Sequence, residues 1–215
     1  IALQSRSAES ALIAARAWED AYPNSRDANR YLLQILVILN RTAETGGLLK
    51  QELALSNQRV KLLTLKALPQ VYGRVSDKTL AAKVVETAVA GELTNTGTGP
   101  TAWTTVGRMR LAADDTAGAL DAAQKAMALD PNDDGAGTLA LQLVDAGAPG
   151  AQDLLRTYLP GNPSPEVRMN YARFLLQTAR NEAAREQLNL LTKSNPELAD
   201  AWLVRASLAV KAKRF

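Results

Sequence analysis

The side chains that could do chemistry in this chain are carboxylates, amides, lysines and arginines, because its 215 residues include no histidine and no cysteine. Ser-His-Asp and Cys-His catalysis, zinc sites built from those residues, and disulfides are therefore excluded. The acidic pairs Asp114-Asp115 and Asp133-Asp134 lie where helices are expected to meet. That position favours helix caps and turns over metal ligation or acid–base catalysis. The sequence predicts no catalytic residue, no metal and no cofactor.

Other candidate motifs also have structural interpretations. The glycine-rich run 97–100 lacks a following Gly-Lys-Ser/Thr, so a turn is favoured over a phosphate-binding loop. The formal net charge of +3 comes from scattered Lys, Arg, Asp and Glu, which favours a solvated surface over a nucleic-acid-binding patch. Trp18, Trp103 and Trp202 occupy expected packing positions. No run is apolar and long enough to span a membrane, since the most apolar segment is 31–39.

The elements that must position any binding residue are clearest around Trp103. Gly107 follows Trp103 by four residues, Ala119 and Ala126 lie seven apart, and Pro131 comes five later. In two antiparallel helices, Trp103 is an apolar plug and Gly107 allows a close approach. The two alanines then share one face of the second helix, and Pro131 stops that helix. This spacing predicts a helix–turn–helix unit.

The unit resembles the tetratricopeptide repeat, a helix pair of about 34 residues that stacks into a solenoid. The resemblance implies an all-α, right-handed α-solenoid of stacked helix–turn–helix repeats. Composition agrees, because hydrophobic residues make up 47% of the chain but aromatic residues only 5%. Such a balance suits helices that pack closely through Ala and Leu better than it suits a β-sandwich.

The same spacing predicts one array over residues 1–215. Ala184 and Pro196 lie twelve apart, as do Ala119 and Pro131, and Ala11 and Pro23. We therefore expect a half repeat, five pairs of unequal regularity, and a truncated repeat. Their bounds are 1–24, 25–57, 58–99 (irregular), 100–133 (the best repeat), 134–164 (degenerate), 165–198 and 199–215.

Local signals set several helix ends. Ser25 is expected to cap the first helix of 25–57, and Ser76 to cap a helix from Asp77 to about Ala90. Pro69 predicts a kink or stop near the end of a helix over 60–72.

The spacing also extends to the ends of the chain and into its degenerate repeat. Pro163 should end the second helix of 134–164. Ile1 reads as mid-helix, so a targeting segment could have been removed before it. Phe215 reads as the opening of a further helix, which would make the chain a piece of a longer array.

Solenoids of this kind generally present their first helices along a concave surface that holds peptides or helices. Positions beside the buried residues of those helices should line it. They are Asn29, Leu33, Leu36, Thr104, Arg108, Leu111, Met169, Asn170, Arg173 and Leu176.

Within that set, Arg108 and Arg173 fall at matching repeat positions. They could donate hydrogen bonds to a partner's carboxylates or carbonyls, or simply be solvated. Asn170 suits the carboxylate-binding clamp of some tetratricopeptide co-chaperones, but Met169 and Thr104 depart from it. The predicted surface is more apolar than basic, which favours a hydrophobic peptide or helix as partner.

A narrower resemblance concerns the runs 29–34, 139–143 and 173–177. They are similar to large proteobacterial tetratricopeptide proteins, often outer-membrane lipoproteins, some of which are adaptors for periplasmic carboxyl-terminal processing proteases. It implies a periplasmic or outer-membrane-attached location, with the cytoplasm as the alternative. The lipid-attachment Cys of such proteins is absent here, so it would have to lie upstream of this sequence.

These observations predict a non-catalytic scaffold or adaptor that binds a protein partner, such as a peptide, a helix or a protease, with no nucleic acid and no direct membrane span. The alternative is a structural module that forms homo-oligomers through its chain ends, with 199–215 docked on the first helix of another copy. A carboxylate-based hydrolase is a distant third, because no Asp/Glu pair converges on an evident pocket.

Overall fold

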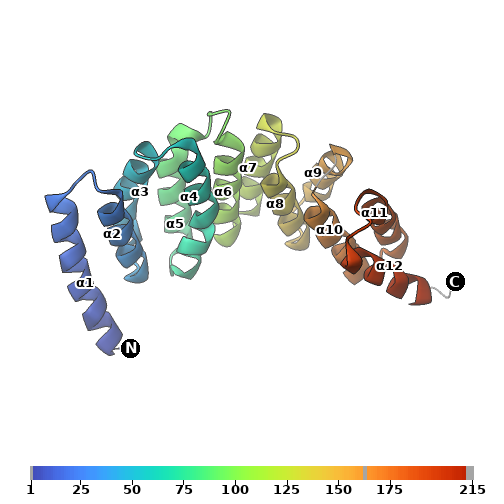
Figure 1. Cartoon of the computed structure of the whole chain (residues 1–215), viewed down its shortest axis with the longest axis horizontal. Coiled ribbons are helices and arrows are strands. Elements are labelled where there is room, and N and C mark those ends of the chain that lie inside the picture. Colours follow the sequence, from blue (N-terminus) through green and yellow to red (C-terminus); the bar gives the residue numbers. More distant parts are fainter. Residues whose placement is uncertain (1, 162–163, 212–215) are drawn as a thin grey trace. The chain divides into compact units, whose positions relative to one another are not determined.

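The computed structural model describes residues 2–161 and 164–211, and within these ranges the chain is all helical (Figure 1). Twelve α-helices and four short 3-10 helices account for the regular structure of the described residues, which include no strand. The chain divides into two compact units, Ile1–Asp130 and Pro131–Phe215, which are described separately here. The expectations for Ile1, Pro163 and Phe215 concern positions outside the described residues.

The first unit contains seven α-helices. They are α1 (Ala2–Ala21), α2 (Arg26–Ile38), α3 (Thr45–Ala54), α4 (Gln58–Val71), α5 (Lys78–Val89), α6 (Gly99–Ala112) and α7 (Thr116–Leu129). Three 3-10 helices join some of them, η1 (Thr42–Glu44), η2 (Tyr72–Arg74) and η3 (Ala90–Glu92). Helix α2 packs against α1 and α3, α5 packs against α3 and α6, and α6 packs against α4 and α7.

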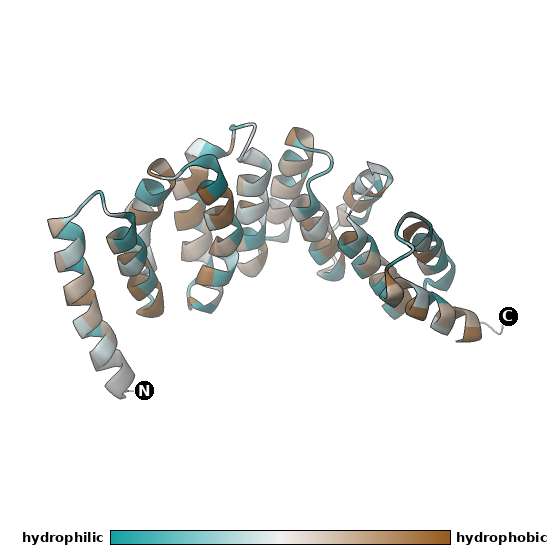
Figure 2. Ribbon diagram, viewed as in Figure 1, coloured by the Kyte–Doolittle hydropathy of each residue, from teal (hydrophilic) through white to brown (hydrophobic). Residues whose placement is uncertain are grey.

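The second unit contains α8 (Asp134–Asp145), α9 (Ala151–Tyr158), η4 (Leu159–Gly161), α10 (Pro165–Gln177), α11 (Asn181–Ser194) and α12 (Ala199–Lys211). Helix α8 packs against α9, α10 packs against α11, and α11 packs against α12, in each case antiparallel. Helix α8 also contacts α10. Figure 2 shows hydrophobic residues along these helices and a hydrophilic connection between α11 and α12. The predicted all-α solenoid of helix pairs is confirmed, and the helix pairs agree with the tetratricopeptide resemblance. The repeat bounds, the right-handed twist and the single array stay predictions.

Helix starts follow from side-chain caps. Ser25 accepts a hydrogen bond from the Ala28 N–H, as the sequence predicted. Asp115 and Asp133, from the two acidic pairs, cap α7 and α8 in the same way. The expectation for Ser76 is wrong, because Asp77 provides the cap of α5. The charged carboxylate of Asp77 interacts favourably with the helix dipole, whereas the neutral hydroxyl of Ser76 would not.

One turn geometry recurs between the first and second helix of four pairs. A residue of positive φ ends the first helix, and the following N–H donates to the carbonyl five residues earlier, at 2.8–2.9 Å. This is the Schellman arrangement, which satisfies carbonyls at a helix end. The positive-φ residues are Asn40, Asp114, Gly147 and Ala179.

The pair α4 and α5 lacks this turn. The chain continues from Pro69, which lies inside α4, into the 3-10 helix η2. Helix α4 ends at Val71, two residues after Pro69, which agrees with the kink or stop expected near the end of a helix over 60–72. A proline near the last turn removes only one helical hydrogen bond, so the helix continues past it.

Candidate functional site

The sequence places the predicted binding residues on the helix that leads each pair. We call α2, α4, α6, α8, α10 and α12 the first helices, and α3, α5, α7, α9 and α11 the second helices. Two cavities open between consecutive first helices, one in each unit. We call them the α2–α4 groove and the α10–α12 groove.

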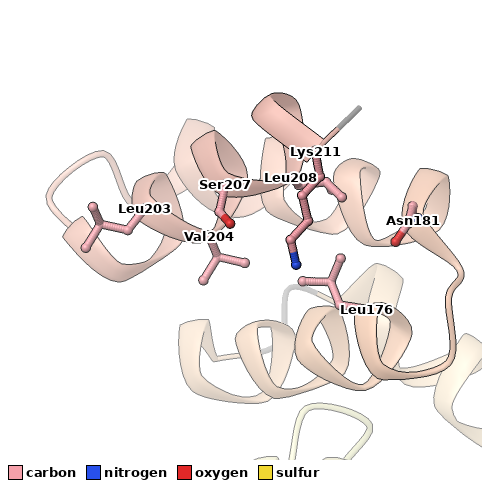
Figure 3. Close-up of a pocket in the computed structure, with 7 residues that line it drawn as sticks. All are labelled: Leu176, Asn181, Leu203, Val204, Ser207, Leu208 and Lys211. Carbon is pink, nitrogen blue, oxygen red and sulfur yellow. The ribbon is translucent and has the colours of Figure 1, made fainter. Parts of the chain in front are cut away.

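The α10–α12 groove has a volume of about 370 Å³ and a largely apolar lining (Figure 3). Leu176 projects into it from α10, and α12 faces it with Val204 and Leu208. Leu203, also from α12, is 68% exposed. The polar side chains around it are Asn181, Ser207 and Lys211, and Figure 3 shows Lys211 extending from α12 toward Leu176.

Helix α11 supports this groove from behind. Ala184, Leu188 and Leu191 are fully buried and form a core with Met169, Leu175 and Ala201. Truncating a large side chain in a densely packed core costs several kcal/mol of folding free energy. Helices α10 and α12, which form the groove walls, are therefore held firmly against α11.

The α2–α4 groove has a volume of about 340 Å³. Its apolar lining comes from three helices and includes Leu33, Leu49, Leu63, Leu68 and Val71. Leu63 is 62% exposed, whereas Leu49 and Leu68 belong to the core of the unit. Both first-helix grooves therefore combine buried leucines with one leucine open to solvent.

A charged side chain lies in the wall of the α2–α4 groove. Glu52 of α3 is only 2% exposed. Its Oε1 accepts a hydrogen bond from Arg26 Nη2 at 2.9 Å and forms an ion pair with Arg30 Nε at 3.3 Å. A buried carboxylate needs such partners, because desolvation of an isolated charge is costly.

A third cavity, of about 490 Å³, lies between the second helices α3 and α5. Gly46 and Gly47 give it a shallow side, and Lys50 and Lys83 lie around it. It is on second helices, so it does not belong to the surface that the sequence predicted.

The structure places two of the ten predicted residues at these cavities. Leu33 lines the α2–α4 groove and Leu176 lines the α10–α12 groove. Their roles in partner binding stay predictions.

Five of the predicted residues are buried. Leu33, at 8% exposure, still lines a groove, whereas for the other four the expectation that they line an open surface is wrong. Asn29 is fully buried and its Nδ2 donates to the Leu48 carbonyl at 2.9 Å, which ties α2 to α3. Leu36 belongs to the core between α1 and α2. Thr104 and Met169 are 4% and 5% exposed. The physical reason is that a first helix contacts helices on several sides, so its buried arc is wider than the sequence spacing indicates.

The remaining predicted residues have intermediate or high exposure but line none of the cavities described above. Arg108, Leu111 and Asn170 are half-buried. Arg173 is exposed and forms an ion pair with Asp200 at 3.7 Å. Arg108 and Arg173 belong to different units, so their proposed pairing stays a prediction.

The tryptophans divide in the same way. Trp103 is half-buried against the core of the first unit, with Lys125 Nζ 4.5 Å above its ring. Trp18 and Trp202 are 40% and 45% exposed, so their expected core placement is wrong. Trp202 Nε1 instead donates to the Pro196 carbonyl at 3.0 Å.

Sequence reasoning missed Glu52, Thr64 and Leu63. A signal existed for Glu52, because it lies between Leu49 and Leu53 of a predicted helix, at a spacing that buries it. A carboxylate at such a position requires a cationic or hydrogen-bonding partner, and two arginines precede it on α2.

Among the described residues, no three His, Cys, Asp or Glu side chains are grouped so as to hold a metal ion. No helix in the described part of the chain has the length and hydrophobicity to cross a membrane. What the grooves present is apolar surface with a few polar groups, which is the usual composition of a binding site.

Comparison with known proteins finds similar chains among solved structures. No family model and no curated protein matches the chain. Among solved structures, MamA (an RS-1 ArsTM double mutant) is 19% identical with a TM-score of 0.41, over 74% of this chain and 86% of MamA. PilF of Pseudomonas aeruginosa is 16% identical with a TM-score of 0.44, over 95% of this chain and 92% of PilF. At these values neither likeness carries an argument about family or role, and the fold rests on the helices and contacts described above.

Proposed function

We propose that this chain is a non-catalytic scaffold that binds a protein partner, as a peptide or a helix, on its first helices. The observation that carries the proposal is the recurrence of an apolar cavity between consecutive first helices in both units. Each cavity has an exposed leucine, Leu63 or Leu203, whose contact with water is unfavourable until a partner covers it. Burial of such a side chain contributes roughly 1.5–3 kcal/mol to binding.

The direct test is a pull-down from a lysate of the source organism with matched variants of the whole chain. The groove variant carries Leu63→Ser and Leu203→Ser. The control variant carries Ile38→Ser and Leu190→Ser. These aliphatic side chains are 70% and 50% exposed and line neither groove. A partner retained by the control and lost by the groove variant supports the proposal. Equal retention by both variants argues against it.

The arginine hypothesis has a separate test on the same partner. Changing Arg108 and Arg173 together to Ala should weaken binding if both side chains donate to the partner. Unchanged binding removes these two residues from the site without affecting the groove proposal.

A more specific role is tethering a periplasmic protease or an envelope assembly factor. Its support is the resemblance of the runs 29–34, 139–143 and 173–177 to proteobacterial lipoproteins. The gene upstream of this sequence tests it. About thirty preceding residues that form a secretory signal ending in a lipid-attachment Cys would support it, whereas their absence would leave the scaffold without this location.

Self-association is the second candidate function. Helix α12 exposes Trp202, Leu203 and Val210, and α1 exposes Ile13 and Trp18. Exposed apolar residues grouped on one helix are typical of contact surfaces. Analytical ultracentrifugation over a hundredfold range of protein concentration, starting at about 1 μM, decides between the candidates. A species that stays monomeric throughout contradicts self-association.

A further inference from the structure

The carboxylate of Glu52 is only half satisfied within the described part of the chain. Its Oε1 is bound by Arg26 and Arg30, whereas its Oε2 is buried and has no hydrogen-bond partner among the described residues. The hydroxyl of Thr64, on the facing helix α4, is likewise buried without a partner there. Both residues line the α2–α4 groove.

Buried polar atoms in folded proteins nearly always have a partner, and those that lack one often belong to functional sites. Glu52 Oε2 can only accept a hydrogen bond, and the Thr64 hydroxyl can donate one. The main chain of an extended peptide offers the complement, an N–H and a C=O on neighbouring residues. The two groups therefore suit a peptide backbone better than a purely apolar ligand.

The charges around the groove select the side chains of that peptide. Arg30 and Glu52 are the charged residues in its lining, and Arg26 also binds Glu52. Two arginines against one carboxylate leave an excess of one positive charge. The Arg30 side chain is 53% exposed, so it can reach a ligand at the rim. An acidic residue is favoured there, and a Lys or Arg is disfavoured.

We propose that the α2–α4 groove binds an extended peptide that inserts an aliphatic side chain between Leu33, Leu49 and Leu68. The peptide donates a backbone N–H to Glu52 Oε2, accepts a hydrogen bond from Thr64, and places a neighbouring Asp or Glu against Arg30. The cavity of about 340 Å³ has room for one such side chain with its flanking backbone. This inference rests on the proposed scaffold function and names the ligand chemistry of one groove.

The probe is a phage library of random peptides of about twelve residues, selected on the whole immobilised chain. The enriched peptides are then synthesised and their affinities measured by fluorescence anisotropy. We expect an aliphatic residue beside Asp or Glu in the enriched sequences.

Variants of the groove test each contact. In Glu52→Gln, the amide oxygen stays with the arginines and an N–H₂ replaces Oε2, so a donor faces the peptide's donor. We expect affinity to fall by about tenfold or more.

Leu63→Ser should weaken binding severalfold, and its control Ile38→Ser should not. Thr64→Val should weaken binding, yet leave the free chain as stable as before or more so, because it removes a hydroxyl that has no partner. This variant keeps the test valid if Glu52→Gln does not fold.

The outcomes separate this inference from the proposed function. Acidic–aliphatic peptides that respond to Glu52→Gln or Thr64→Val support it. Peptides rich in Lys or Arg, or peptides that bind all these variants equally, overturn it but leave peptide binding elsewhere on the scaffold. A selection that enriches no peptide overturns this inference, whereas the proposed function, which includes a helix as partner, is decided by the pull-down.

Discussion

The positive-φ turns between first and second helices provide a quantitative test in the second unit. Gly147 has φ of +71°, and a Cβ added there meets no heavy atom within 4 Å. Ala179 occupies the equivalent position between α10 and α11 with φ of +58°. The two turns share the same hydrogen bond to a carbonyl five residues earlier. Gly147→Ala and Ala179→Gly are therefore opposite changes to one backbone geometry.

The magnitude follows from the backbone alone. An L-residue in the left-handed region costs roughly 1–2 kcal/mol. Replacing Gly by Ala also restricts the unfolded chain, which returns about 0.4–1 kcal/mol. Since the Cβ of Gly147→Ala meets open space, no steric cost is added. The free energy of unfolding should fall by about 1 kcal/mol in Gly147→Ala and rise by about the same in Ala179→Gly.

Urea unfolding followed by circular dichroism and by tryptophan fluorescence measures both changes. Trp202 is the single tryptophan of the second unit, since the other two lie in the first. Midpoint shifts of opposite sign with unchanged slopes are expected. Shifts of the same sign, or no effect of Gly147→Ala, would refute the turn argument.

Two further predictions concern buried hydrogen bonds of the first unit. Tyr72 donates to Thr45 Oγ1 at 2.6 Å, and burial raises the pKa of its phenol although that hydrogen bond lowers it in part. Tyr72→Phe should lower the free energy of unfolding by about 1 kcal/mol at neutral pH. This difference should disappear as the pH rises above about 10 and through the raised pKa of Tyr72, and urea midpoints at several pH values would show it. Burial alone would raise the pKa of Glu92, but hydrogen bonds from Lys61 and Thr98 and the charge of Lys61 lower it overall. Lys61→Met should therefore cost about 2 kcal/mol at pH 7, and this cost should shrink as the pH falls below about 4 and Glu92 takes up a proton; a cost independent of pH would contradict the ion-pair argument.

The fold was largely predictable because its signals are local. The spacing from Trp103 to Pro131 corresponds to α6 and α7, and the acidic pairs contain the caps of α7 and α8. The turn after α4 could not be predicted, because Pro69 is compatible with either a stop or a last helical turn, and tertiary contacts decide between them.

The binding surface was predictable only in part. Leu33 and Leu176 reach the grooves, whereas Leu36 and Asn29 turn inward against α1 and α3. Residues one turn apart on a helix can face a groove or a neighbouring helix, and the sequence does not contain the positions of those neighbours. The place of Glu52 in the α2–α4 groove could not be predicted either, because it depends on how α3 packs against α2.

The central claim is that a partner lies in the grooves between first helices, and site-specific photo-crosslinking tests it most directly. A photoreactive phenylalanine analogue is placed singly at Leu63, Leu203, Ile38 or Leu190 of the whole chain in the source organism, and crosslinked products are identified by mass spectrometry. We expect one protein to be crosslinked from Leu63 or Leu203 and to be absent from the Ile38 and Leu190 controls. Crosslinks confined to the control positions, or no product from either groove, would contradict it.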